Sequence, residues 1–242
     1  MKRRAFFLFA LAATVVLSCK KEEETPKVIY DASTQKGSEA PKVDTVSIEV
    51  ADLPVHIPGT QYLIHPVGKL SLRSDYKSSN TYSGEVGSNA PSNISNYRDF
   101  EITGMLSNLK FQKVGQDSIY PLSEKPVYIQ TATFLKSVAD KTKQQFLVYT
   151  LEDEDTNRDG QLNEKDIKAL YISNADGSNF EKLTAPFHEL IDWKLIEETN
   201  TIYFRTAEDS NKNGKFDVED KIHYNSLKLP GKAADVKNYK IQ

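Results

Sequence analysis

Two segments in the second half of the chain carry oxygen-bearing residues at a spacing that suits calcium. Calcium takes carboxylate, amide and carbonyl oxygens, and one common arrangement is a 12-residue loop with ligands at positions 1, 3, 5, 7 and 12. Position 6 is glycine, because the chain turns sharply there. The first segment supplies Asp155, Asn157, Asp159, the backbone carbonyl of Gln161, and Asp166, with Gly160 at position 6.

The second segment repeats this pattern 54 residues further along the chain. Its expected ligands are Asp209, Asn211, Asn213, the backbone carbonyl of Lys215, and Asp220, with Gly214 at position 6. Position 5 is an amide here and position 12 is a short Asp in both segments, so we expect weak binding, about 10⁻⁴ to 10⁻³ M. Two calcium ions of this affinity would suit a structural role outside the cell.

Both segments resemble the calcium loop of EF-hand proteins in its dockerin-like form, which has Asp at position 12. The flanking residues favour strands and not helices, so we expect each loop to join two strands, without the helix pair that opens in calcium sensors. The alternative is that both segments are ordinary turns, because Asp, Asn and Gly favour turns without any metal.

The sequence shows no nucleophile elbow, phosphate loop or dinucleotide fingerprint. The four histidines, His56, His65, His188 and His223, share no ligand spacing, and we expect them to be structural or exposed. We therefore predict no catalytic residue and no enzymatic activity. A pair of acidic residues acting on a glycosidic bond is the alternative that the sequence leaves open.

The first 18 residues have the pattern of an export signal. Residues 1–4 are cationic, and residues 5–17 form an apolar run that is shorter than the roughly 20 residues needed to cross a membrane. The run ends in Val16-Leu17-Ser18-Cys19, which resembles a bacterial lipobox. The resemblance implies that Cys19, the only cysteine, carries a lipid; an ordinary signal peptide with an incidental cysteine is the alternative.

A charged and polar segment follows, and we expect residues 19–45 to be the lipidated cysteine and a flexible tether. The acidic residues 22–24 resemble the surface-export signal of Bacteroidota-type lipoproteins. This implies an outer-membrane lipid anchor with display at the cell surface; a periplasm-facing position is the alternative. The formal net charge of −3 argues against nucleic acid, so the expected partners are the membrane, through Cys19, and a protein or glycan.

Residues 46–242 are expected to form one mainly β domain. They contain short aromatic and β-branched runs bounded by Gly, Pro, Asn or Asp, and no long helical period. Residues 74–96, rich in Ser and Asn, are expected to be a long polar loop. The predicted strands are 61–67, 98–102, 108–114, 127–135, 145–151, 169–173, 190–196, 201–206, 222–229 and 236–241.

The repeat covers residues 145–177 and 199–231 and indicates stacked β units. Residues 170–179, then Trp193 and residues 202–204, resemble blades of TolB-type, WD-repeat-like β-propellers. We count about three blade-sized units, whereas closed propellers have about four or more. The resemblance therefore implies an incomplete or irregular propeller-like domain, and a β-sandwich is the alternative.

Together these features predict a calcium-binding, lipid-anchored cell-envelope protein that acts as a non-enzymatic binding or scaffold module. The alternative function is an enzyme or accessory protein in extracellular polysaccharide breakdown.

Overall fold

The computed structural model describes residues 25–30, 47–71 and 94–241. The predicted signal peptide, Cys19, most of the predicted tether and most of the predicted polar loop lie outside these residues. Among the residues that are described, no helix is both long enough and apolar enough to cross a membrane.

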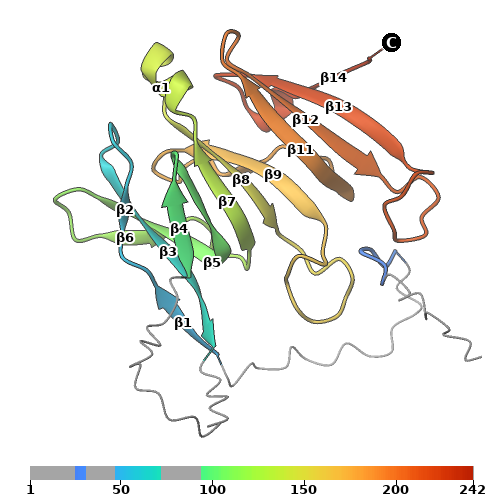
Figure 1. Cartoon of the computed structure of the whole chain (residues 1–242), viewed down its shortest axis with the longest axis horizontal. Coiled ribbons are helices and arrows are strands. Elements are labelled where there is room, and N and C mark those ends of the chain that lie inside the picture. The colour runs from blue at the N-terminus through green and yellow to red at the C-terminus, as the bar shows by residue number, and fades with distance from the viewer. Residues whose placement is uncertain (1–24, 31–46, 72–93, 242) are drawn as a thin grey trace, which may run out of the picture.

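In the described part of the chain, antiparallel strands form two sheets (Figure 1). The larger, ten-stranded sheet has the order β1-β3-β5-β7-β8-β9-β10, with β2 paired to β3, and with β4 and β6 paired to β5. Its strands are β1 (Ser47–Ala51), β2 (Val55–His56), β3 (Tyr62–Ser71), β4 (Ser95–Arg98), β5 (Glu101–Lys113), β6 (Ile119–Pro121), β7 (Tyr128–Phe134), β8 (Phe146–Glu152), β9 (Lys168–Asn174) and β10 (Glu181–Lys182).

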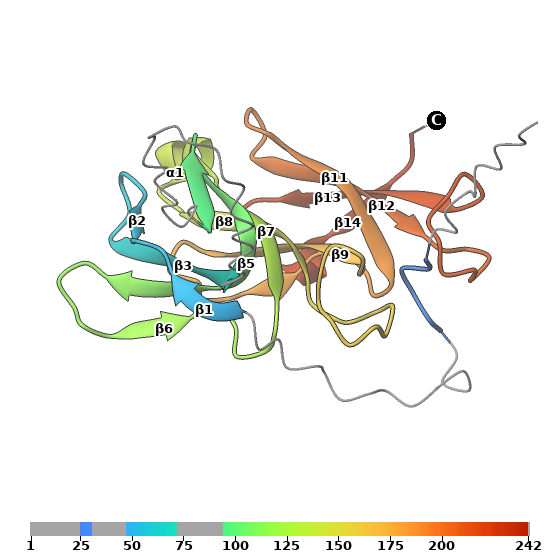
Figure 2. The same ribbon diagram turned by 60° about the horizontal axis from the view of Figure 1, so that its bottom comes forward.

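The smaller sheet has four strands in the order β11-β12-β13-β14 and lies next to β9 in both ribbon views (Figures 1 and 2). One short helix, α1 (Lys136–Thr142), follows β7, and a 3-10 turn, η2 (Ala233–Asp235), follows β13. The strands of the smaller sheet are β11 (His188–Ile196), β12 (Thr201–Glu208), β13 (Lys221–Lys228) and β14 (Lys237–Tyr239).

Strand β8 has buried side chains on both of its faces, because successive side chains alternate between the faces of a strand. Leu147, Tyr149 and Leu151 belong to a first core, formed by residues of the larger sheet and its connections. Val148 belongs to a second core, which the larger sheet shares with the smaller one. The members of the second core are Leu135, Val138, Val148, Leu170, Ile172, Leu183, Leu190, Ile202, Phe204, Leu227 and Leu229.

The fold is mainly β, as predicted, and neither sheet closes into a barrel or a propeller. The arrangement is compatible with a sandwich-like fold. The expected division into about three blade-sized units is not seen. Strands β8 and β9, which carry the first copy of the repeat, continue into the N-terminal strands as one sheet.

Most predicted strands are confirmed to within a few residues, but the strand predicted at residues 98–102 is wrong. The chain turns at Asp99 and Phe100, which have φ of 52° and 67°, between β4 and β5. The short elements α1, β6 and β10 were not predicted, because a segment of two to seven residues is too brief to show a period.

Candidate calcium loops and the segment between them

Each predicted calcium loop lies at the tip of an antiparallel hairpin. Residues 155–166 (loop 1) connect β8 to β9, and residues 209–220 (loop 2) connect β12 to β13. The expectation that strands flank both loops is confirmed. In Figure 1, the yellow loop 1 and the red loop 2 lie on the same side of the molecule, with the blue segment 25–30 between them.

The carboxylate at position 1 is held by the backbone in the same way in both loops. Asp155 accepts hydrogen bonds from the backbone N–H groups of Asp159 and Gly160, with N···O distances of 3.1 and 2.9 Å. Asp209 accepts the two equivalent bonds, at 3.1 and 2.7 Å. The glycine at position 6 has positive φ in both copies, 81° at Gly160 and 79° at Gly214, which favours glycine over other residues.

The side chains at positions 3 and 5 also match. In loop 1, Asn157 accepts from the N–H of Asp159 at 2.9 Å, and Asp159 accepts from the N–H of Gln161 at 2.8 Å. In loop 2, Asn211 and Asn213 accept the equivalent bonds at 2.9 and 2.7 Å, the second from the N–H of Lys215. The oxygens at positions 1, 3 and 5 therefore point inward toward their own loops.

The Asp at position 12 closes each loop by accepting backbone hydrogen bonds from both of its ends. Asp166 accepts from the N–H groups of Thr156 and Asn163 at 2.8 and 3.0 Å. Asp220 accepts from those of Ser210 and Asp217 at 3.0 and 2.9 Å. Burial raises the pKa of Asp166, and the backbone hydrogen bonds partly oppose that rise.

The donor set of these loops fits calcium, because carboxylate, amide and carbonyl oxygens are the ligands that a hard cation prefers. Each carboxylate oxygen has two lone pairs, so an oxygen that accepts one backbone hydrogen bond keeps capacity for a cation. Asp166 Oδ1 is the exception, because it accepts from the N–H groups of both Thr156 and Asn157. In the described residues neither loop brings three of its carboxylates within 4.8 Å of one another. The structure thus shows two matched turns with inward-facing oxygens and not a closed carboxylate cage.

Residues 25–30, which we assigned to the flexible tether, are hydrogen-bonded to both loops. The N–H groups of Lys27 and Val28 donate to the carbonyl of Gly214 in loop 2, at 2.6 and 3.2 Å. The N–H of Ile29 donates to the carbonyl of Thr156 in loop 1 at 3.0 Å, and the Thr156 hydroxyl donates to the carbonyl of Lys27 at 2.7 Å. The expected flexibility therefore does not extend to this segment.

Side chains of the same segment add further contacts. Val28 is buried, and the Lys27 Nζ atom lies 2.8 Å from a carboxylate oxygen of Glu189 and 3.2 Å from the carbonyl oxygen of Asp166. Burial, and then a hydrogen bond to Asp209, raise the pKa of Tyr30. The segment thus joins loop 1, loop 2 and the start of β11.

Glu152, the last residue of β8, is a fully buried carboxyl group beside this segment. Its Oε1 atom accepts from the side-chain amide of Gln130 at 2.7 Å, whereas its Oε2 atom has no hydrogen-bond partner. Burial raises the pKa of Glu152 to about 8, and the nearby Lys27 only partly opposes this rise. Glu152 is therefore mostly neutral at pH 7.

Two histidines that look unrelated in the sequence come together in the smaller sheet. One ligand atom from each of His188, Glu208 and His223 lies within 4.8 Å of the other two. Burial and the neighbouring His223 lower the pKa of His188. The three residues lie on three adjacent strands, so strand register brings them together, and no sequence spacing reveals it.

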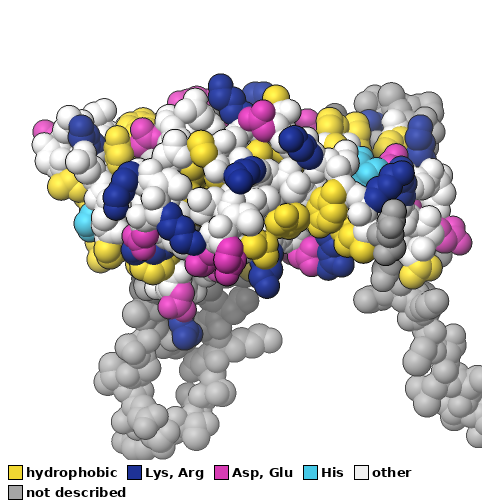
Figure 3. Space-filling view, turned by 90° about the horizontal axis from the view of Figure 1, so that it is seen from above, with side chains coloured by type: hydrophobic (Ala, Val, Ile, Leu, Met, Phe, Trp, Pro, Cys, Tyr) yellow, Lys and Arg dark blue, Asp and Glu magenta, His cyan; other side chains and the backbone are white. Residues whose placement is uncertain are grey.

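The expectation that the four histidines are structural or exposed does not foresee that His188 and His223 come together with Glu208. It agrees with the structure for His56 and His65, which bond to the Thr60 carbonyl and the Gln112 side chain at 3.1 and 3.0 Å. Histidine side chains reach the surface near both ends of the face shown in Figure 3, where acidic and basic side chains are interspersed.

Two concave sites lie apart from the histidines, and the lining of the first includes Asp155 and Gln161 of loop 1. A pocket of about 660 Å³ adjoins loop 1 and is lined in part by Tyr171, Phe180 and Asp153. The rings of Tyr171 and Phe180 are stacked with centroids 4.6 Å apart, and the Tyr171 hydroxyl donates to Asp153 at 2.6 Å. This pocket combines an aromatic surface with a carboxylate.

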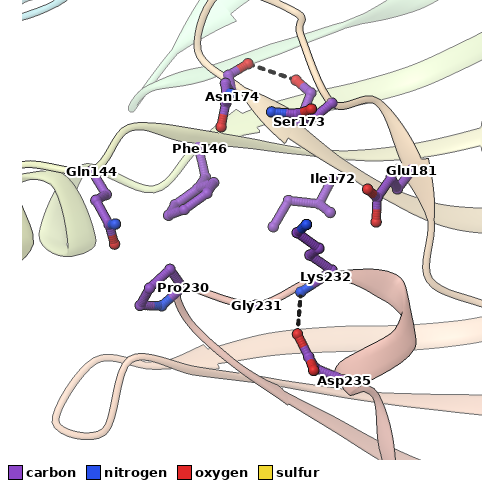
Figure 4. Close-up of a pocket in the computed structure, with 11 residues that line it drawn as sticks. Gln144, Phe146, Ile172, Ser173, Asn174, Glu181, Pro230, Gly231, Lys232 and Asp235 are labelled. Carbon is purple, nitrogen blue, oxygen red and sulfur yellow. Dashed lines mark hydrogen bonds between the residues drawn. The ribbon is translucent and has the colours of Figure 1, made fainter.

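The second pocket, of about 320 Å³, lies between the two sheets (Figure 4). Phe146 and Ile172 line it from the larger sheet, and Pro230 and Gly231 line it from the chain after β13. The Asp235 carboxylate at its edge accepts a hydrogen bond from the Lys232 backbone at 2.9 Å. That hydrogen bond holds the turn at η2.

No protein-family model, no curated protein and no solved structure matches this chain. The class of the protein is therefore defined by its own architecture: a mainly β protein with two matched loop hairpins that share one N-terminal segment.

Proposed function

We propose that this protein is a calcium-binding, lipid-anchored cell-envelope protein whose two loops fasten the N-terminal segment to the β domain. The observation that carries the proposal is the set of hydrogen bonds from residues 25–30 to Gly214 and Thr156, one in each loop. Residue 25 follows the proposed lipidation site, Cys19, by only six positions. The loops would therefore hold the domain where the chain leaves the membrane.

Calcium and the segment would be coupled through the shape of the loops. The two carbonyls that accept hydrogen bonds from the segment belong to the loops themselves. Thr156 is position 2 of loop 1, and Gly214 is position 6 of loop 2. An ion that binds better to the ordered loop than to a disordered one stabilises the ordered form by mass action. By linkage, calcium then strengthens docking of residues 25–30, and docking strengthens calcium binding by the same factor.

This arrangement supports a structural role for calcium and a binding or scaffold role for the protein as a whole. The proposed location is the outer membrane, facing the cell surface, with a periplasm-facing position as the alternative. The proposed partners are the membrane and a protein or glycan. We further propose that the hairpins β8-loop 1-β9 and β12-loop 2-β13 are two copies of one blade-like unit.

Calorimetric titration of calcium into chelator-treated protein from residue 20 to residue 242, with thermal unfolding alongside, tests this proposal. We expect two sites and a melting temperature that rises with calcium. Asp155→Ala and Asp209→Ala should each remove one site, because each deletes a position-1 carboxylate. Asp176→Asn, which changes an acidic turn residue outside both loops, should keep both sites. No binding heat and no thermal shift in the unaltered protein would refute the calcium role.

A role in polysaccharide binding or breakdown is the second candidate. The observation that favours it is the pocket beside loop 1, because stacked aromatic rings next to a carboxylate suit the apolar faces and hydroxyl groups of a sugar. Titration with a panel of oligosaccharides tests it. Binding that Phe180→Ala abolishes would support this role, and the absence of binding across the panel would count against it.

A further inference from the structure

The side chains of His188, Glu208 and His223 project from one face of the smaller sheet. The register pairs His188 on β11 with Glu208 on β12, and pairs Thr206, two residues before Glu208, with His223 on β13. Because directly paired residues share a face, these side chains lie on the same side of the sheet. The two imidazole ring centroids are 4.8 Å apart, and His223 Nε2 lies 2.6 Å from a carboxylate oxygen of Glu208.

Two buried polar side chains, Thr206 and Asn225, position the imidazole ring of His188. Its Nδ1 atom lies 3.2 Å from the hydroxyl oxygen of Thr206, which is 1% exposed. The side-chain amide of Asn225, also buried, donates to the same oxygen at 3.5 Å. Donation of an Nδ1 proton to Thr206 selects the tautomer whose Nε2 is free to bind a metal, which is how ligating histidines are usually oriented.

We propose that His188, Glu208 and His223 form a binding site for a divalent transition metal, of which zinc is the best match. Imidazole nitrogens suit zinc and its neighbours, whereas calcium selects oxygen ligands alone. Two histidines and one carboxylate supply three ligands and leave a fourth position for water or for a group from a partner.

A metal ion can reach these ligands from solvent. The side chain of Glu208 is 44% exposed and that of His223 is 19% exposed. Lys221, directly opposite Glu208 in the register, is exposed and brings a positive charge nearby, so the site has to bind its cation against some repulsion. Two neutral imidazoles and one carboxylate can do so, because nitrogen coordination to zinc does not require a large negative charge.

The site shares no ligand with the calcium loops, but Glu208 directly precedes Asp209 of loop 2, so the test is designed to keep the two kinds of site apart. The protein from residue 20 to residue 242 contains all of the described structure and is titrated with Co²⁺ in saturating calcium. We expect one Co²⁺ per chain, visible absorption typical of a nitrogen-ligated site of low coordination number, and displacement by zinc. His188→Gln and His223→Gln should each abolish this spectrum. Thr206→Val should weaken binding about tenfold by removing the group that orients His188.

His56→Gln and His65→Gln are the matched controls and should leave the spectrum unchanged, because both residues lie on the larger sheet. Circular dichroism and retained calcium binding report whether each variant is folded. X-ray absorption of the zinc-loaded, unaltered protein gives an answer that needs no variant. Scattering from two imidazoles supports the site, and an oxygen-only shell overturns it, as would a Co²⁺ spectrum that survives both histidine substitutions.

Discussion

Loop 1 and loop 2 have the same internal hydrogen bonds but different surroundings. Position 12 shows the contrast: Asp166 in loop 1 is fully buried, whereas Asp220 in loop 2 is half-buried. Position 1 shows the reverse, because Asp155 is exposed and Asp209 is buried. The same local sequence thus forms the same loop on two different sheets.

The strand before each loop differs more than the loop itself. Glu152 on β8 corresponds to Thr206 on β12 through the 54-residue repeat, and both are buried. Thr206 is neutral and interacts with His188 and Asn225, whereas Glu152 leaves one oxygen atom without a partner. The shape of each loop is therefore determined by residues close in sequence. The contribution of each loop region to the free energy of unfolding depends on the elements packed around it.

The largest effect we predict is for Gly214→Ala in loop 2. Its φ of 79° is costly for alanine, and the added methyl group would collide with the backbone oxygen of Val28 and lie 2.8 Å from the Pro26 side chain. We expect a loss of about 4 kcal/mol in the free energy of unfolding, measured by urea denaturation. Protease cleavage within residues 25–30 should increase, because the segment is displaced.

Gly115→Ala is the matched control for Gly214→Ala. Gly115 has nearly the same φ, 80°, but its added methyl group would have no atom within 4 Å. This variant isolates the backbone cost, which should be about 1 kcal/mol. Equal losses in the two variants would mean that residues 25–30 do not press against loop 2.

Glu152→Gln should stabilise the protein at neutral and mildly alkaline pH. The folded protein keeps the Glu152 proton up to a pKa of about 8, whereas the ordinary value is 4.5. Between these values the unfolded chain binds fewer protons than the folded one, so the free energy of unfolding falls as pH rises. Glutamine does not ionise, so we expect a gain of about 3 kcal/mol near pH 7, most of it absent near pH 4.

Unfolding measured from pH 4 to pH 8 tests this prediction. The exposed Glu198→Gln variant serves as the control and should change stability by less than about 0.5 kcal/mol at every pH. A Glu152→Gln curve that runs parallel to that of the unaltered protein would show that Glu152 ionises normally in the folded state.

Features carried by neighbouring residues in the chain could be predicted from the sequence. The positions of both loops follow from Asp, Asn and Gly at fixed offsets within 12 residues, and their flanking strands follow from the residues on either side. Alternating apolar residues likewise indicate strands such as β8 and β12.

Features that depend on distant contacts could not be predicted in this way. The pairing of β5 with both β3 and β7 merges the first repeat copy into the larger sheet, and no local pattern shows it. Residues 25–30 are more apolar than the charged residues just before them, but their docking depends on carbonyls that two distant hairpins offer. His188 and His223 are brought together only by the register of β11, β12 and β13.

Lys27→Met should weaken the link between the segment and loop 1. The substitution removes the ion pair with Glu189, whose side chain is only 13% exposed, and the bond to the Asp166 carbonyl. The loss of its charged partner leaves the mostly buried Glu189 with only the hydrogen bond from the Lys168 N–H, and this should cost about 2 kcal/mol, measurable by urea denaturation. The pKa of Glu152 should rise further, because Lys27 lowers it. Lys136→Met, which breaks an exposed pair with Asp140, should cost about 0.3 kcal/mol.

Apart from the control variants, the smallest effects we predict come from exchanging position 5 between the loops. Asn213→Asp gives loop 2 the carboxylate that loop 1 has at Asp159, and Asp159→Asn does the reverse. Calcium affinity rises with the number of ligand charges, so each exchange should shift one site by about tenfold, or about 1.4 kcal/mol, in opposite directions. Two-site calorimetry measures both shifts.

The double variant Asp159→Asn with Asn213→Asp separates charge from surroundings. If ligand charge alone ranks the two sites, the double variant should exchange their affinities. If the surroundings matter as well, loop 2 with the added carboxylate should bind differently from unaltered loop 1, because Asp209 is buried where Asp155 is exposed. Affinities unchanged by either single substitution would show that position 5 does not contact the ion, and the side chains at positions 1, 3 and 12 would then have to account for binding.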